Sequence, residues 1–303
     1  MDQERLKVKG ERDMTEQIVY LNGQWMPIDE AKVPVLDRGF IFGDGIYEVV
    51  PIYGGKPFRW EQHLNRLQRS LDKIGITNPH TREQWTALVK ELQSKHAWLD
   101  QFIYIQVTRG VAKRDHAFPK TAVTPTVFAM ASEFVHAPAA QREQGVAAVS
   151  LPDERWLHCD VKSTSLLGNV LAKQAAVEAG GFECVMFRNG FLTEGSSANI
   201  WVARNGKLLC PPRDNLILEG IRVALIEELC THAGLVLEIR PITREEVLTA
   251  DELMLSSATK EVLPITSLDG DKVGNGRDGV EKGKPGPMYK ALYEAYQHAK
   301  RAA

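Results

Sequence analysis

Short apolar runs alternate along the chain with stretches in which apolar residues recur every three or four positions. The short runs come in pairs, and each pair is separated by two residues that readily adopt the positive φ of a tight hairpin turn. We therefore predict four β-hairpins, in sheets where antiparallel pairing dominates. The four turns are Asn22-Gly23, Gly54-Gly55, Asn189-Gly190 and Asn205-Gly206.

The three- and four-residue spacing predicts helices, because it gathers apolar side chains on one face. Leu64, Leu67 and Leu71 form such a stripe within residues 60–74. Thr243 and Glu246 have the spacing of a capping box and open a helix over residues 243–250. The other predicted helices cover residues 82–98, 166–179, 221–233 and 287–302.

This order of elements predicts an α+β fold with two domains. Pro138 and several small residues follow a strand-like run over residues 126–130, so we place a linker at residues 134–140. A small α+β domain then covers residues 14–133, and a larger domain with antiparallel strands and helices covers residues 141–303. Residues 1–13 are charged and lack the apolar stretch of a signal peptide, so we expect a disordered leader, with Met14 as a candidate start.

Composition narrows the functional classes. The 303 residues carry a net charge of −2, which gives no general attraction to nucleic acid or to an anionic membrane surface. No apolar run is long enough to span a bilayer. The four cysteines are far apart and form no CxxC pair, so we expect no metal site or redox motif, and a reducing cytoplasm as the location.

A set of local sequence patterns in a fixed order indicates the catalytic function. They are Asp37-Arg38-Gly39-Phe40 followed by Gly43-Asp44-Gly45, then His63-Leu64-Asn65-Arg66-Leu67, Arg114-Asp115-His116, Val161-Lys162-Ser163, Thr193-Glu194-Gly195-Ser196-Ser197, Leu218-Glu219-Gly220-Ile221 and Ser256-Ser257-Ala258-Thr259. Each pattern alone is weak, but together they resemble the class IV aminotransferases that depend on pyridoxal 5′-phosphate (PLP), and most closely the D-amino-acid (D-alanine) transaminases. The resemblance runs from about Ile18 to the C-terminus. It implies the fold-type IV architecture, with the cofactor at the interface of the two domains.

The resemblance also implies roles for single residues. Lys162 matches the lysine that forms the Schiff base with PLP, and Glu194 matches the glutamate that faces the pyridine nitrogen. Arg66 matches the arginine on the cofactor phosphate. The remaining cofactor positions implied are Ser196, Ser197, Ile221, Arg222, Ser257, Ala258 and Thr259.

Arg114 and His116 match a pair that binds the substrate carboxylate in the D-amino-acid branch. In that branch the pair reaches the active site of the partner subunit, which implies a homodimer. Phe40 stands where many of these enzymes have a tyrosine whose hydroxyl helps to bind the carboxylate. We therefore place Phe40 in the substrate site as well.

These residue types suit the chemistry. A lysine amine attacks an aldehyde when it is deprotonated, and it can then move a proton between the substrate and the cofactor. An acidic group beside the pyridine nitrogen keeps that nitrogen protonated and strengthens PLP as an electron sink. A phosphate favours an arginine fork and the free N–H groups at the start of a helix. A carboxylate favours a bidentate arginine.

Two positions depart from the family's phosphate site. Arg222 replaces a threonine at the start of a helix, and Ala258 replaces another threonine, with Thr259 adjacent. Two hydroxyl contacts are therefore absent. Our hypothesis is that Arg222 offsets them by its charge.

The function we expect is transamination of D-amino acids by a ping-pong route, in which D-alanine and 2-oxoglutarate give pyruvate and D-glutamate. The alternatives on the same fold are a branched-chain L-amino-acid aminotransferase, an (R)-amine transaminase and an aminodeoxychorismate lyase, and Arg114-x-His116 argues for the D-amino-acid branch. A non-catalytic PLP-binding protein is a remoter alternative, against which both Lys162 and Glu194 argue. A nucleic-acid-binding module lacks a basic surface.

Overall fold

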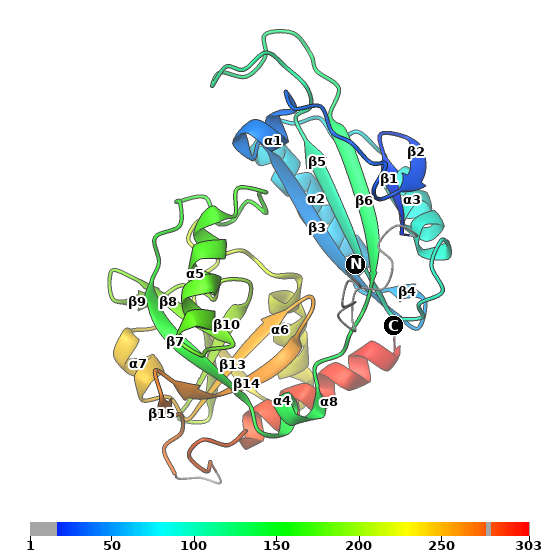
Figure 1. Cartoon of the computed structure of the whole chain (residues 1–303). Helices are drawn as coiled ribbons and strands as arrows, with labels where there is room; N and C mark the ends of the chain where they lie inside the picture. The colour runs from blue at the N-terminus through cyan, green and yellow to red at the C-terminus, as the bar shows by residue number, and fades with distance from the viewer. Residues whose placement is uncertain (1–16, 277–279, 303) are drawn as a thin grey trace, which may run out of the picture.

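Two sheets organise the chain, each with its own helices (Figure 1). The computed structural model describes residues 17–276 and 280–302, so the predicted leader, residues 1–13, lies outside the described residues. We call the first sheet with its helices the small domain and the second sheet with its helices the large domain. This is the expected α+β architecture.

The small domain is built on a six-stranded antiparallel sheet with the order β2-β1-β6-β5-β3-β4. Helices α2 and α3 pack against it, and the apolar stripe of α2, with Leu64, Leu67 and Leu71, is buried in its core. The strands are β1 (Ile18–Leu21), β2 (Gln24–Pro27), β3 (Gly45–Tyr53), β4 (Lys56–Pro57), β5 (Gln101–Thr108) and β6 (Thr126–Glu133). The helices are α1 (Arg38–Phe42), α2 (Trp60–Lys73) and α3 (Arg82–Ser94).

The large domain is built on a nine-stranded mixed sheet with the order β12-β11-β10-β13-β14-β7-β8-β9, and β15 pairs with β14. Its strands are β7 (Val146–Pro152), β8 (Glu183–Arg188), β9 (Phe191–Leu192), β10 (Asn199–Arg204), β11 (Lys207–Cys210), β12 (Val236–Ile239), β13 (Glu252–Ser257), β14 (Glu261–Leu268) and β15 (Asp271–Lys272). Its helices are α4 (Ala139–Glu143), α5 (Leu167–Glu178), α6 (Ile221–Ala233), α7 (Arg244–Leu248) and α8 (Pro287–Ala302).

The four predicted hairpins are present. They join β1 to β2, β3 to β4, β8 to β9 and β10 to β11, and Asn22, Asn189 and Asn205 have the positive φ that such turns require. Antiparallel pairs dominate as expected, but three pairs in the large sheet are parallel: β7 with β8, β7 with β14, and β11 with β12. The strands of each parallel pair are separated in sequence by a helix or by a longer stretch of chain, so no turn signal announces them.

The predicted helices are also present, with small differences at their ends. Helix α3 stops at Ser94 rather than at residue 98, and the capping box of Thr243 and Glu246 opens α7 as expected. The short helix α1 was not predicted from the apolar spacing, because its five residues are too few to show a period.

Asp37 ties α1 to the small sheet. Its buried carboxylate caps α1 by accepting a hydrogen bond from Gly39 N, and it accepts the hydroxyl protons of Thr108 on β5 and Thr126 on β6 at 2.7 and 2.6 Å. Three donors at one end of the sheet therefore depend on one side chain.

We expect Asp37→Ala to destabilise the protein by about 3 kcal/mol, because buried donors that lose their acceptor retain their desolvation cost. The shift of the urea unfolding midpoint measures this effect. Asp29→Ala, at an exposed aspartate in the same domain, is the control and should leave the midpoint unchanged. Equal midpoints for the two variants would show that Asp37 does not hold α1.

Candidate active site

A cavity of about 490 Å³ lies between the two domains. Tyr47 and Val49 on β3 and Arg66 on α2 line it from the small domain, and the large domain supplies the other walls. All the residues expected at the cofactor line this one cavity: Lys162, Glu194, Arg66, Ser196, Ser197, Ile221, Arg222, Ser257, Ala258 and Thr259.

The backbone around Lys162 is bonded to the small domain. Tyr47 N donates to the carbonyl of Lys162 at 2.9 Å, and Thr164 N donates to the carbonyl of Gly45 at 3.0 Å. The hydroxyl of Thr164 also donates to the carbonyl of Gly43. The segment that carries Lys162 therefore runs along the start of β3, although it belongs to the large domain.

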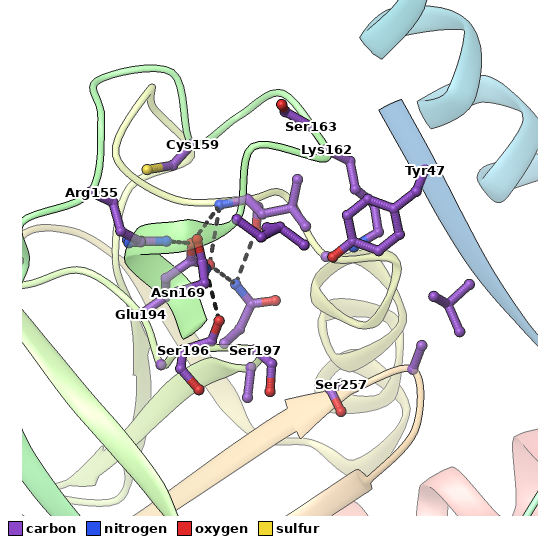
Figure 2. A pocket seen from close by; sticks show the side chains of 18 of the residues that line it. Tyr47, Arg155, Cys159, Lys162, Ser163, Asn169, Glu194, Ser196, Ser197 and Ser257 are labelled. Carbon is purple, nitrogen blue, oxygen red and sulfur yellow. Dashed lines mark hydrogen bonds and ion pairs between the residues drawn. The ribbon is translucent and has the colours of Figure 1, made fainter. Parts of the chain in front are cut away.

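The Lys162 side chain enters the cavity beside an aromatic ring. Its Nζ lies 4.1 Å from the centroid of the Tyr47 ring, and Tyr47 in turn stacks on Tyr104. Figure 2 shows Lys162 and Tyr47 on one side of the pocket and Arg155 with Glu194 on the other. Within the described part of the chain, no carboxylate forms an ion pair with Lys162, so its amine is available to a ligand.

Glu194 is buried and held on several sides. It pairs with Arg155 and accepts from Leu218 N at 3.1 Å and from the side-chain amide of Asn199 at 3.3 Å. Arg155 is itself fixed, because its Nε and Nη2 bind the two carboxylate oxygens of Asp153 at 2.9 and 2.8 Å. These contacts hold the carboxylate of Glu194 at the wall of the cavity.

Burial raises the pKa of Glu194 to about 7, even though the ion pair with Arg155 and the N–H of Leu218 act in the opposite direction. The pKa of Arg155 is raised, because its hydrogen bonds and charge interactions with Asp153 and Glu194 outweigh its own burial. Arg155 is therefore a permanent cation. Glu194 is poised to lose its proton when a second positive charge comes near.

Ser196 and Ser197 are oriented by a buried acid. The Glu183 carboxylate accepts from the hydroxyls of both serines and from the backbone N–H groups of Ser196 and Cys184. The hydroxyl protons thus point to Glu183, and the free lone pairs of the serine oxygens remain for a ligand in the cavity.

Arg66 marks the other end of the cavity. Its Nε and Nη2 bind the two carboxylate oxygens of buried Glu48 at 2.7 and 2.8 Å, and its Nη1 donates to the carbonyl of Glu219 at 3.1 Å. A guanidinium has five N–H donors, so two remain for a phosphate. Burial alone would raise the pKa of Glu48, but the charges and hydrogen bonds of Arg66 and His63 lower this pKa by more than burial raises it. Glu48 is therefore ionised and fixes the guanidinium of Arg66.

The start of α6 faces the same end. Its N-cap is Gly220, which has no side chain to cap the helix, so the first N–H groups, at Ile221 and Arg222, are open to an anion. Together with Arg66 and the turn of Ser257 to Thr259, they fit a phosphate.

Arg222 is fully buried, and its charge has no carboxylate partner among the described residues. Its guanidinium carbon lies 5.0 Å from the Phe58 ring and 5.5 Å from the Tyr296 ring, and Nη2 donates to the carbonyl of Ala258 at 3.5 Å. Nε and Nη1 are buried without a hydrogen-bond partner. A buried, uncompensated cation next to Ala258 fits an anionic group at this end of the cavity.

The residues expected at the substrate carboxylate lie elsewhere. Arg114 and His116 are exposed on the loop between β5 and β6, and neither lines the cavity of its own chain. Phe40 is 74% exposed and lines a second cavity of about 550 Å³, which shares only Leu166 with the first.

Tyr47 and Arg155 are among the residues of the first cavity that were not predicted from the sequence. Tyr47 lies on β3, and nothing in a strand pattern marks its ring as a neighbour of Lys162. Arg155 lies in an irregular stretch and meets Glu194 across 39 positions of sequence. The one signal is the cluster of charged residues in Asp153-Glu154-Arg155, shortly before Lys162. Elsewhere, residues 17–276 and 280–302 contain no cluster of metal-binding side chains and no helix long and apolar enough to cross a membrane.

Known proteins are similar to this chain in sequence and in fold. Over 281 residues, the chain is 39% identical to the D-alanine aminotransferase of Bacillus licheniformis, and the match covers 93% of this chain and 96% of that protein. It is 38% identical over 278 residues to the D-alanine aminotransferase of Staphylococcus haemolyticus, and that match covers 92% and 96% of the two chains.

Among solved structures, the branched-chain amino acid aminotransferase of Escherichia coli superposes with a TM-score of 0.85 at 23% identity, over 93% of this chain and 94% of that one. A branched-chain aminotransferase from Thermoproteus uzoniensis, solved with norvaline, gives a TM-score of 0.82 at 27% identity, over 94% and 95%. Another branched-chain amino acid aminotransferase, solved in complex with N-(5′-phosphopyridoxyl)-L-glutamate, gives a TM-score of 0.84 at 23% identity, over 94% of each chain.

Residues 45–268 match the family model described as amino-transferase class IV, and this range contains Lys162, Glu194, Arg66 and the start of α6. Class IV aminotransferases depend on PLP, so PLP is the cofactor of this chain. The chain is an enzyme that belongs to the class IV aminotransferases.

Proposed function

We propose that the protein transfers the amino group of D-amino acids, converting D-alanine and 2-oxoglutarate to pyruvate and D-glutamate by a ping-pong route. The observation that carries the proposal is the geometry of one cavity, which has Lys162 on one wall, Glu194 on another and Arg66 with the start of α6 at one end. The D-alanine aminotransferases at 37–39% identity support the substrate class.

The residues divide the work by position. PLP, when bound, supplies the electron sink for the carbanion of the substrate. Arg66 and the N–H groups of Ile221 and Arg222 would hold its phosphate, Glu194 would keep its ring nitrogen protonated, and Ser196 and Ser197 would bind it as well. Lys162 would hold the cofactor through its amine and would move the proton at the substrate Cα. Ser257, Ala258 and Thr259 complete the phosphate end.

Arg114 and His116 bind the substrate carboxylate in this proposal, and they do so in a partner's cavity. Two features support a dimer. The pair does not line its own cavity, and an apolar band beside the cavity is exposed: Leu167, Val170 and Leu171 on α5 are 71%, 57% and 62% exposed. Exposed patches of this kind are typical of protein interfaces. Phe40 lies at the second cavity, which we place at the same interface.

Transamination of branched-chain L-amino acids is the second candidate. The solved structures named above favour it, because they are branched-chain aminotransferases of the same fold. Their identity to this chain is 23% and 27%, however, which is below that of the D-alanine enzymes.

The four cysteines, all free and buried, fit the reducing cytoplasm that we propose as the location.

The first prediction concerns the substrate. When D-alanine is added to the PLP-loaded protein without an oxo acid, the cofactor absorption should shift from the pyridoxal to the pyridoxamine form, and L-alanine should leave it unchanged. Lys162→Ala should abolish the shift. Conversion by L-valine or L-leucine alone would establish the branched-chain alternative instead.

The second prediction concerns Glu194. Its pKa in the folded apoprotein is raised from 4.5 to about 7, so the apoprotein loses stability as the pH rises through this window, where only the unfolded chain is already ionised. Glu194→Gln removes this loss, and its melting temperature relative to the unaltered apoprotein should rise between pH 5 and pH 8. The kcat of the loaded variant should fall by about 100-fold.

The neighbouring, exposed Glu154 provides the control, because Glu154→Gln should change neither the pH slope nor kcat. An unchanged pH slope in Glu194→Gln would show that Glu194 does not titrate in this range.

The third prediction concerns Arg222. Arg222→Met should weaken PLP binding about tenfold, because it removes the uncompensated charge near the phosphate. It should also leave the apoprotein as stable or more stable, because a buried cation without a partner is costly. PLP titration and apoprotein melting measure the two effects, and Arg222→Lys should retain most of the affinity. Unchanged affinity in Arg222→Met would exclude a role for this charge.

A further inference from the structure

The loop 111–125, which joins β5 to β6, has almost no regular structure of its own. Residues 113–118 are exposed, and the loop projects from the end of the small sheet in Figure 1. Arg114 and His116 belong to this exposed part of the loop. Side chains that must meet a substrate carboxylate need a fixed backbone, so the contacts that hold this loop decide whether it works.

Arg38 binds the backbone of the loop. This buried residue of α1 donates from Nη1 to the carbonyl of Asp115 at 2.6 Å and to the carbonyl of Ala117 at 3.4 Å. The two carbonyls lie on either side of His116, and the first belongs to the residue after Arg114. Arg38 therefore fixes the two peptides that orient the pair.

Asp44 holds Arg38 in place and shares its charge with a second arginine. Its carboxylate accepts from Arg38 Nε at 2.7 Å and from Arg109 Nε and Nη2 at 2.7 and 3.0 Å. Burial alone would raise the pKa of Asp44, but the hydrogen bonds from Arg109 and Arg38 lower this pKa by more than burial raises it. The net shift of the pKa is downward. The acid is ionised and binds both arginines.

Arg109 extends the cluster in two directions. It donates to the carbonyls of Ile74 and Gly75, just beyond the end of α2, at 2.7 and 3.1 Å. Its guanidinium carbon also lies 3.7 Å from the centroid of the Phe118 ring, in the loop. The loop is thus anchored to the helix that carries Arg66.

Phe42 completes the support. The centroid of its ring lies 5.5 Å from the His116 ring and 5.5 Å from the guanidinium carbon of Arg114, and the Arg38 guanidinium carbon lies 4.8 Å from the same centroid. Arg114 and His116 therefore both contact the ring of Phe42, which Arg38 contacts as well.

We propose that Arg38, held by Asp44, is a positioning residue for the substrate carboxylate, and that it acts on the active site of the partner protomer rather than on its own. The inference rests on the proposed function, in which Arg114 and His116 bind the carboxylate across a dimer. Arg38 touches neither substrate nor cofactor. It acts through the backbone of the loop and through the ring of Phe42.

The first test separates substrate binding from turnover. Arg38→Met should raise the KM of the amino acid about tenfold, the effect of losing one charge-assisted hydrogen bond, while kcat changes by less than about twofold. PLP affinity, measured by titration, should not change. Arg82→Met, at an exposed arginine that pairs with Glu61, is the control and should change none of the three.

Arg38→Lys guards against a failure to fold, because it keeps the charge beside Asp44 and removes the fork that reaches the carbonyls. It should also raise KM. A normal KM in a folded Arg38→Met or Arg38→Lys variant would overturn the proposal, and so would a loss of PLP affinity equal to the change in KM.

The second test asks which protomer Arg38 serves. Arg38→Met and Lys162→Ala are co-expressed with different tags, and the hybrid is isolated on both tags. The hybrid has a single intact Lys162, in the Arg38→Met chain, and the loop that serves it comes from the Lys162→Ala chain with Arg38 intact. The hybrid should therefore show the KM of the unaltered protein. A KM as high as that of the Arg38→Met homodimer, or a failure to form hybrids, would overturn action on the partner.

The amino acid used is whichever one converts the cofactor of the unaltered protein. Conversion by L-valine and not by D-alanine would contradict the D-amino-acid proposal, but the KM values of Arg38→Met and Arg82→Met could still be compared with L-valine as the substrate. A wrong substrate class is therefore distinguished from a wrong role for Arg38.

Discussion

The site depends on one short stretch of backbone pairing between the domains. Lys162 and Thr164 belong to the large domain, yet they exchange hydrogen bonds with Tyr47 and Gly45 at the start of β3. Ser70 on α2 adds a further contact, because its hydroxyl oxygen accepts a hydrogen bond from Lys162 N. Because the lysine is bound to the small domain by its backbone, its side chain keeps a fixed relation to Tyr47 and to the helix that carries Arg66, and the cavity forms between them.

Charge is distributed unequally around that cavity. At the Arg66 end, Glu48 neutralises the arginine that would meet a phosphate, and Arg222 supplies a positive charge with no acid beside it among the described residues. At the Glu194 end, Asp153 and Arg155 form a pair, and Glu194 then has only a share of Arg155. One end favours an anion and the other a cation, which is the polarity of a cofactor with a phosphate and a protonated ring nitrogen.

The sequence predicted what depends on neighbours in the chain and on the family resemblance. Asn-Gly turns indicated the hairpins, helical spacing indicated α2 and α6, and the ordered motifs indicated Lys162, Glu194 and Arg66. It did not predict contacts whose partners are distant, such as the ion pair of Arg155 with Glu194 or the parallel pairing of β7 with β14. In these cases each residue satisfies a buried group that only the assembled fold brings near, so no local pattern marks it.

The way in which Arg38 binds its loop has a consequence for the side chains of the loop. It contacts main-chain carbonyls of Asp115 and Ala117, and every amino acid provides such a carbonyl. These two hydrogen bonds therefore do not depend on which side chains positions 115 and 117 carry. Phe118 differs, because its ring contacts Arg109, so the loop is held at one point by its backbone and at another by the identity of a side chain.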